Sequence, residues 1–94
     1  MGRRSIAEKV CLDIDISDPR PKKLKLVIYD FTGEKIPSKF FDNLKRVFGL
    51  MHDGWMLQYS AIVTERMSTA LAVAELARHY RCRSVRVYAV EELA

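Results

Sequence analysis

The chain has 94 residues, of which 16 are Lys or Arg and 12 are Asp or Glu, so its formal net charge is +4. This length is typical of one domain with a modest core. The sequence has no run of about 20 apolar residues of the kind that crosses a membrane. No apolar signal segment follows Met1 either. We therefore expect a cytoplasmic protein with no membrane partner, whose mild positive charge permits a phosphate-bearing one.

The two cysteines and two histidines do not predict a zinc site. Cys11 and Cys82 lie far apart in the sequence, and neither His52 nor His79 stands at a metal-ligand spacing from them. The sequence predicts two small, buried, free thiols.

Residues 1–23 are expected to form an N-terminal extension of a domain that covers residues 24–94. Within the extension, Val10–Ile16 alternates apolar and polar side chains with a period of two, which predicts a half-buried edge strand. The strand is expected to end before Pro19 and Pro21, because proline has no amide hydrogen to give to a sheet.

The domain is expected to be organised around Leu24–Phe31, with the sequence Leu-Lys-Leu-Val-Ile-Tyr-Asp-Phe. This short run is rich in β-branched and aromatic residues, which is typical of a central strand buried on both faces. Asp30 would then stand near the end of the strand. A carboxylate there is either a cap or turn acid or a metal ligand.

Two amphipathic helices are predicted in the remainder of the chain. Apolar residues recur at three-to-four spacing over residues 37–49, where Pro37 suits the first helical turn. A second helix is predicted over residues 67–80, with Ser68 or Thr64 as a candidate N-terminal cap.

Three further strands are predicted over residues 55–58, 61–65 and Ser84–Val90, with one long bent strand over residues 55–65 as the alternative to the first two. The order from residue 24 is therefore βαββαβ. This order predicts an α+β, ferredoxin-like fold, in which an antiparallel sheet carries two helices on one face. Residues 10–16 would add an extra N-terminal strand.

Few residues suit catalysis. The chain has no Gly-x-Ser-x-Gly segment and no nucleotide-binding glycine pattern, and His52-Asp53 fits a polar turn better than a proton-transfer pair. Asp30 is the leading candidate, because a central strand would hold its carboxylate at a fixed point. Asp13 and Asp15 share one face of the predicted edge strand and have the oxygen donors that a hard cation takes, but a solvated strand face explains them better.

Basic residues fall into groups that suit either a phosphate-contacting surface or ordinary surface charge. No group is interleaved with exposed aromatic residues as in a platform for single strands, so we expect sequence-independent, salt-sensitive binding of nucleic acid. Lys25 belongs to the first of these groups. The residues expected to contact nucleic acid are Lys22, Lys23, Arg81, Arg83 and Arg86.

Three segments, in order, resemble the small adaptation subunit called CRISPR-associated protein two. Val27–Phe31 resembles the family's first strand, which ends in Tyr-Asp. Gly54–Ile62 is similar to its Gly-x-Arg-Val-Gln-x-Ser-Val-Phe segment, and Ser84–Tyr88 to its closing Ser-Val-Arg-Ile-Tyr strand. Element order and spacing agree across Leu24–Val90.

The resemblance implies a homodimer whose two sheets face each other. It implies that the two copies of Asp30 approach across the twofold axis and can hold Mg²⁺, since Asp30 matches the family's metal-site aspartate. Arg86 matches the arginine of the last strand. The implied function is in antiviral defence, either as a scaffold that holds DNA beside a CRISPR integrase subunit or as a metal-dependent endonuclease acting on DNA or RNA.

Three departures from the family pattern bear on this choice. Met56 stands where arginine is usual, which removes one phosphate contact and favours the scaffold. Ile62 replaces a phenylalanine, and the chain stops soon after its last strand, where family members add a strand that pairs with the partner subunit. We expect Val10–Ile16 to supply that strand instead. A stand-alone ribonuclease of toxin type and a non-catalytic regulatory module of the same fold are the alternatives.

Overall fold

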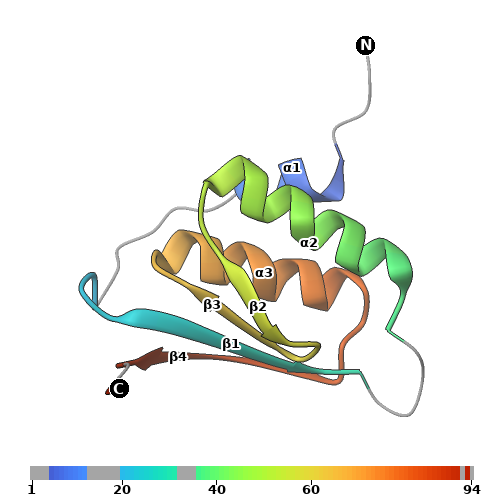
Figure 1. The fold of residues 1–94 in the computed structure, drawn as a ribbon. Coiled ribbons are helices and arrows are strands. Elements are labelled where there is room, and N and C mark those ends of the chain that lie inside the picture. The colour runs from blue at the N-terminus through green and yellow to red at the C-terminus, as the bar shows by residue number, and fades with distance from the viewer. Residues whose placement is uncertain (1–4, 13–19, 32–35, 92, 94) are drawn as a thin grey trace.

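The computed structural model of the protein describes residues 5–12, 20–31, 36–91 and 93. These residues form three helices and a four-stranded sheet (Figure 1). In chain order the elements are α1 (Ile6–Leu12), β1 (Leu24–Asp30), α2 (Ser38–Met51), β2 (Trp55–Gln58), β3 (Ala61–Thr64), α3 (Met67–His79) and β4 (Ser84–Val90).

The sheet has the strand order β2-β3-β1-β4, and every neighbouring pair of strands is antiparallel. The first strand of the βαββαβ unit therefore lies in the interior of the sheet, between β3 and β4. This arrangement confirms the predicted α+β, ferredoxin-like fold and the predicted positions of its two main helices and four strands.

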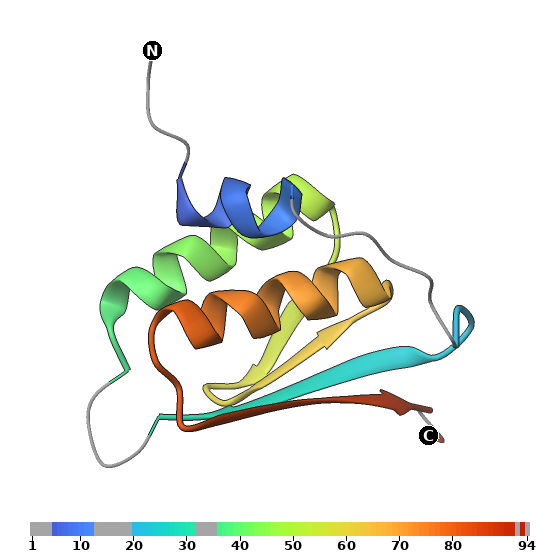
Figure 2. The ribbon, with the colours of Figure 1, turned by 180° about the vertical axis from the view of Figure 1, so that it is seen from behind.

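The helices form two further layers on one side of the sheet (Figures 1 and 2). α2 and α3 cover the sheet, and α1 packs against both of them on the side away from the strands. Ala7 of α1 is fully buried in this contact, with Ile6 and Val10 packed beside it. Among the described residues, no helix is long and apolar enough to cross a membrane.

The predicted strand over Val10–Ile16 is wrong where the structure describes it, because Val10, Cys11 and Leu12 belong to helix α1. Residues 13–16 lie outside the described residues. The alternation of apolar residues was misleading here. Ile6, Ala7, Val10 and Cys11 follow the three-to-four spacing of a helix equally well, and the helical layer offers them an apolar surface.

Only one face of β1 is buried in this chain, so the prediction of a strand buried on both faces is also wrong. Lys25, Val27 and Tyr29 point under the helices and are at most 1% exposed. Leu24, Leu26 and Ile28 point to the opposite side, where Ile28 remains 41% exposed. We call this uncovered side of the sheet the open face.

Aromatic side chains fill the core between β1 and α2. The rings of Tyr29 and Phe40 meet edge-to-face with centroids 5.0 Å apart. The Tyr29 hydroxyl donates a hydrogen bond to the carbonyl of Tyr59, which holds the β2–β3 turn against β1. Burial raises the pKa of Tyr29 to about 12, so this donor stays protonated at neutral pH.

Candidate nucleic-acid interface

Asp30 is the last residue of β1 and pairs in register with Ser84 at the start of β4. Its side chain is exposed and follows the alternation of the strand onto the open face. The carboxylate makes no hydrogen bond or ion pair with another described residue. Among the described residues Asp30 is therefore not a cap or turn acid, and its role as a metal ligand stays a prediction.

The connection from α3 to β4 brings three arginines to the same end of the sheet. The backbone amide of Arg83 donates to the carbonyl of Asp30, with nitrogen and oxygen 2.6 Å apart. Arg86 pairs in register with Ile28, two residues from Asp30 on β1, and lies on the open face. The side chains of Arg81, Arg83 and Arg86 are exposed and have no ion-pair partner in the described part of the chain. We call these three residues the arginine cluster.

Arg81 adopts a backbone conformation that normally belongs to glycine. α3 ends at His79, Tyr80 caps it, and Arg81 follows with φ of 62°. The left-handed region costs a residue with a Cβ roughly 1–2 kcal/mol, which is why glycine is common just after a helix. Its amide donates to the Arg78 carbonyl at 2.9 Å, so the local turn is well formed in spite of this cost.

Lys22 and Lys23 lie at the opposite end of the sheet from the arginine cluster. They precede β1, whereas the cluster surrounds its end, and six residue steps of roughly 3.3 Å separate the two by about 20 Å. The Lys23 ammonium pairs with Glu91, with nitrogen and oxygen 3.1 Å apart. The structure therefore does not bring the two predicted basic groups together. Each remains a separate candidate for phosphate contact.

Lys25 is a structural residue, although the sequence grouped it with Lys22 and Lys23. Its side chain is buried under the helices. The ammonium donates to the carbonyls of Arg20, Lys23 and Glu65 at 2.6, 2.7 and 3.2 Å. It thus joins the turn before β1 to the turn before α3. The signal that could have revealed this role is its position in the strict alternation of β1, on the same face as Val27 and Tyr29.

Asp53 is also structural. Its two carboxylate oxygens accept the amides of Glu65 and Arg66 at 2.8 and 2.9 Å, where the chain enters α3. Burial would raise the pKa of Asp53, but these two hydrogen bonds and the charge of Arg66 outweigh it and lower the pKa. The predicted caps are therefore wrong. Thr64 and Ser68 do not cap the helix, and Asp53, from the turn before β2, holds the backbone just ahead of it.

The described residues of one chain place no group of metal ligands around Asp30. The described residues contain no group of three or more Asp, Glu, His or Cys side chains that could hold a metal ion. Mg²⁺ is commonly held by one or two carboxylates together with phosphate oxygens. The neighbours of Asp30 on the adjoining segment are arginines. A second carboxylate would have to come from outside this chain. Asp13 and Asp15, the other candidates, lie outside the described residues.

The open face is apolar over most of its area. One row runs straight across all four strands, since Trp55 pairs with Val63, Val63 with Leu26, and Leu26 with Tyr88. Trp55 and Tyr88, at the two ends of the row, are 42% and 43% exposed. The described strand residues on this face include two charged ones, Asp30 and Arg86, and both stand at the end that carries the arginine cluster.

Arg86 and the exposed Tyr88 share one face of β4, a juxtaposition of arginine and aromatic side chains that was not predicted from the sequence. The signal was present in the alternation of Ser84–Val90. Trp55 lies three strand spacings away from Tyr88, or about 14 Å. The residues between these aromatics are aliphatic. This composition suits contact with another protein better than it suits the binding of stacked bases, because a groove for stacked bases needs cations along its length.

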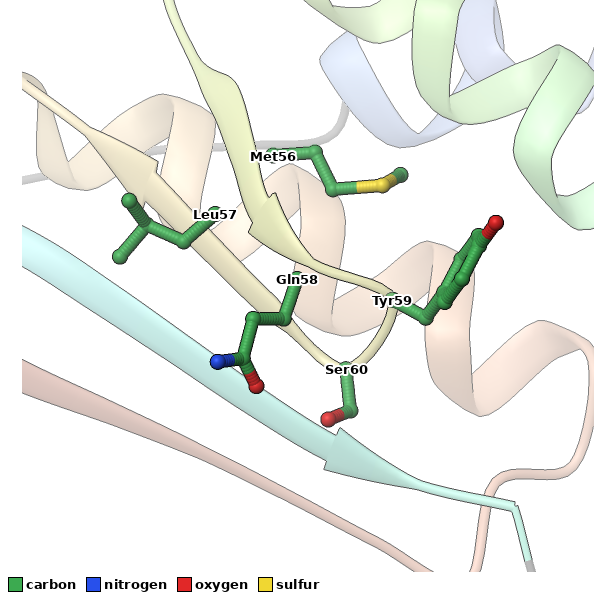
Figure 3. Close-up of a pocket in the computed structure, with 5 residues that line it drawn as sticks. All are labelled: Met56, Leu57, Gln58, Tyr59 and Ser60. Carbon is green, nitrogen blue, oxygen red and sulfur yellow. The ribbon is translucent and has the colours of Figure 1, made fainter.

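A hollow of about 590 Å³ lies at the β2–β3 turn and is lined by residues 56–60 (Figure 3). Figure 3 shows Met56 and Leu57 extending to opposite sides of β2. The hollow lies at the Asp30 end of the sheet, because the Tyr29 amide donates to the Ser60 carbonyl at 3.1 Å. None of its lining residues is charged. Met56, which stands where the resembling family has arginine, therefore has no cationic replacement among them.

Comparison of the chain with protein-family models, with curated proteins and with solved structures found no match. The resemblance to the CRISPR adaptation subunit therefore rests on the three sequence segments that carry it.

Proposed function

We propose that this protein is a homodimeric scaffold that binds the phosphate backbone of nucleic acid and does not cleave it. The observation that carries the proposal is the arginine cluster, in which the fold gathers Arg81, Arg83 and Arg86 at one end of the sheet. Guanidinium groups bind phosphate oxygens with two parallel hydrogen bonds. Among the described residues none of the three is used in a salt bridge.

The backbone of Arg81 supports this role. A residue that keeps a side chain at φ of 62° gives up stability that glycine would supply. Strained residues that persist are concentrated at functional sites. A charge needed at the surface explains why arginine rather than glycine follows α3.

The homodimer would form through the apolar row of the open face, and the end of that face that carries Arg86 would stay accessible. Two copies that each carry a net charge of +4 repel each other, so contact is least unfavourable through an uncharged surface such as the apolar row. By its resemblance, such a dimer would act in the cytoplasm in CRISPR adaptation, where it would hold duplex DNA or RNA beside an integrase subunit.

The test compares two triple variants in binding to a duplex DNA of arbitrary sequence, measured by fluorescence anisotropy. Replacing Arg81, Arg83 and Arg86 by alanine is expected to weaken binding at least 10-fold. The matched control replaces Lys39, Lys45 and Arg46, three exposed cations on α2, and is expected to bind nearly as the wild type does. Equal reductions in both variants would show that net charge, and not the cluster, governs binding.

A magnesium-dependent nuclease is the second candidate, favoured by the exposed carboxylate of Asp30 at the end of an interior strand. Because one chain contributes one such carboxylate, this function needs Asp30 from two copies. Cleavage of DNA or RNA by the wild type in Mg²⁺, abolished in Asp30→Asn, would favour the nuclease over the scaffold.

A further inference from the structure

The layer of the fold farthest from the sheet is a short helix held by apolar contacts. α1 lies on α2 and α3, on their side away from the strands (Figure 2). Ala7 is fully buried there, and Ile6, Val10 and Cys11 pack beside it. No side-chain hydrogen bond or ion pair joins the described residues of α1 to α2 or α3. One narrow apolar stripe therefore keeps α1 in place.

α1 is also too short to be a stable helix without this packing. It spans only Ile6–Leu12, and helices of fewer than about 12–15 residues are marginal in water. The Ser5 hydroxyl accepts the Glu8 amide at 3.1 Å, which helps the first turn to form. In the sequence, residues 13–23 separate α1 from β1, which is enough chain for α1 to leave its place while the sheet and the two long helices stay folded.

α1 leaves part of the surface beneath it unfilled. A hollow of about 350 Å³ lies beside it and is lined by Ser5, Glu8, Arg46, Gly49 and Leu50. Leu50 is 50% exposed, and a Cβ at Gly49 would meet no neighbouring side chain within 4 Å. Glycine weakens a helix interior, and no close contact in the described part of the chain requires it at this position. The outer surface of α2 therefore has room for more than α1 covers.

The charges around the hollow favour an acidic ligand. Glu8 and Arg46 both line it, but neither forms an ion pair with the other or with any other described residue. The exposed cations of α1 and α2 outnumber the exposed carboxylates by four to two, with Lys9, Lys39, Lys45 and Arg46 against Glu8 and Asp42. An unpaired guanidinium thus stands beside an exposed leucine, and a carboxylate is its best partner.

We propose that the outer surface of α2 and α3 is a docking site for an acidic amphipathic helix of another protein, which displaces α1. α1 is the occupant of this site within the chain, and its buried residues show which apolar spacing fits. A partner helix of about four turns extends past the end of α1, covers Leu50 and places a carboxylate against Arg46. The site lies on the opposite side of the molecule from the open face, so it does not depend on the proposed function (Figures 1 and 2).

The presence of α1 makes the affinity of this site adjustable. A partner binds only those molecules from which α1 has undocked, so its apparent affinity is reduced by the fraction that is undocked. A substitution that loosens α1 should therefore tighten the binding of a partner, whereas one that fills the hollow should weaken it.

The test measures binding of a labelled synthetic peptide to the full chain by fluorescence anisotropy. The peptide has roughly 14 residues, repeats the apolar spacing of α1 and carries glutamate at the outward positions. Ala7→Gln, which is too large for the buried position of Ala7, is expected to bind the peptide about 5-fold more tightly than the wild type. Gly49→Trp, which fills the hollow, is expected to bind it about 10-fold more weakly. Neither substitution changes the net charge.

The contribution of charge is tested with two neighbouring cations. Arg46→Gln is expected to weaken binding of the peptide several-fold. The matched control is Lys45→Gln, which removes the same charge from an exposed residue that does not line the hollow, and it is expected to bind as the wild type does. Equal losses in the two variants would overturn the assignment of the acidic partner to the hollow.

Two further results would overturn the proposal. Equal affinities of the wild type and Gly49→Trp would show that the peptide binds elsewhere, and equal affinities of the wild type and Ala7→Gln would show that α1 does not compete. Circular dichroism checks that both variants are folded. If Ala7→Gln is unfolded, hydrogen exchange of the wild type replaces it. The hydrogen-bonded amides of α1 are expected to exchange faster than those of α3, and equally slow exchange would overturn the displacement of α1.

Discussion

Replacing Arg81 by glycine should stabilise the fold and weaken nucleic-acid binding at the same time. Arg81 has φ of 62°, which costs a residue with a Cβ roughly 1–2 kcal/mol. Glycine removes that cost but gives the unfolded chain more freedom, which offsets roughly 0.4–1 kcal/mol. Removing a cation beyond the negative end of α3 offsets a few tenths more. The expected net gain is about 0.5 kcal/mol in the free energy of unfolding.

The chain offers a matched control at the end of the other long helix. His52 follows α2 with φ of 52°, and its backbone amide donates to the Phe48 carbonyl. His52→Gly should therefore raise stability by a similar amount. Since His52 is not part of the arginine cluster, DNA affinity should not change.

Urea unfolding measures the first effect and fluorescence anisotropy with duplex DNA the second. For a chain of this size, 0.5 kcal/mol corresponds to about 2–4 °C in Tm. Arg81→Gly should gain this stability and bind DNA several-fold more weakly, whereas His52→Gly should gain stability alone. Destabilisation by both substitutions would refute the backbone argument. Unchanged DNA affinity in Arg81→Gly would refute the role of Arg81 in binding.

Three further substitutions test individual structural assignments. Asp53→Asn should cost about 1–2 kcal/mol, because it weakens the acceptors for the amides at the start of α3. Because the pKa of Asp53 is lowered in the folded state, the unfolded state binds the proton more readily. The wild type should therefore keep this contribution to its stability above about pH 4 and lose it as the pH falls through the lower folded-state pKa. Urea unfolding should show that the difference in the free energy of unfolding between the wild type and Asp53→Asn is smaller at pH 3 than at pH 7. Lys25→Met should cost roughly 1–3 kcal/mol by chemical denaturation, since it leaves partly buried carbonyls without their donor, and a neutral result would contradict the structural role of Lys25. Asp30→Asn should bind DNA as tightly as the wild type or slightly more tightly, because it removes a negative charge beside the arginine cluster, and weaker binding would contradict the scaffold.

The fold was predictable because its local signals agree with one another. The apolar spacing of residues 37–49 and 67–80 predicted α2 and α3, and the alternation over Ser84–Val90 predicted β4 with its observed bounds. The N-terminal segment failed because its apolar residues satisfy both a period of two and a helical spacing. Over seven residues the two patterns are hard to separate, and packing against α2 and α3 decides between them.

The candidate site was predictable in its residues but not in its grouping. Asp30 and the three arginines follow from the sequence. That β1 would be open on one side does not, because a strand that is apolar on both faces has the same sequence whether a helix or another subunit covers it. The structural roles of Lys25 and Asp53 were not predicted for a related reason. Their partners are backbone groups of distant turns, which no local pattern specifies.

The salt dependence of duplex DNA binding tests the central claim most directly. Each phosphate that the protein neutralises changes the slope of log K against log salt concentration by about −0.9. We predict a steep slope for the wild type. Replacing Arg81, Arg83 and Arg86 by alanine should make the slope shallower by about 0.9 for each phosphate that these arginines neutralise. The DNA should be recovered intact in the presence of Mg²⁺. Equal slopes for the wild type and the variant, or cleavage of the DNA, would contradict a scaffold that binds through the arginine cluster.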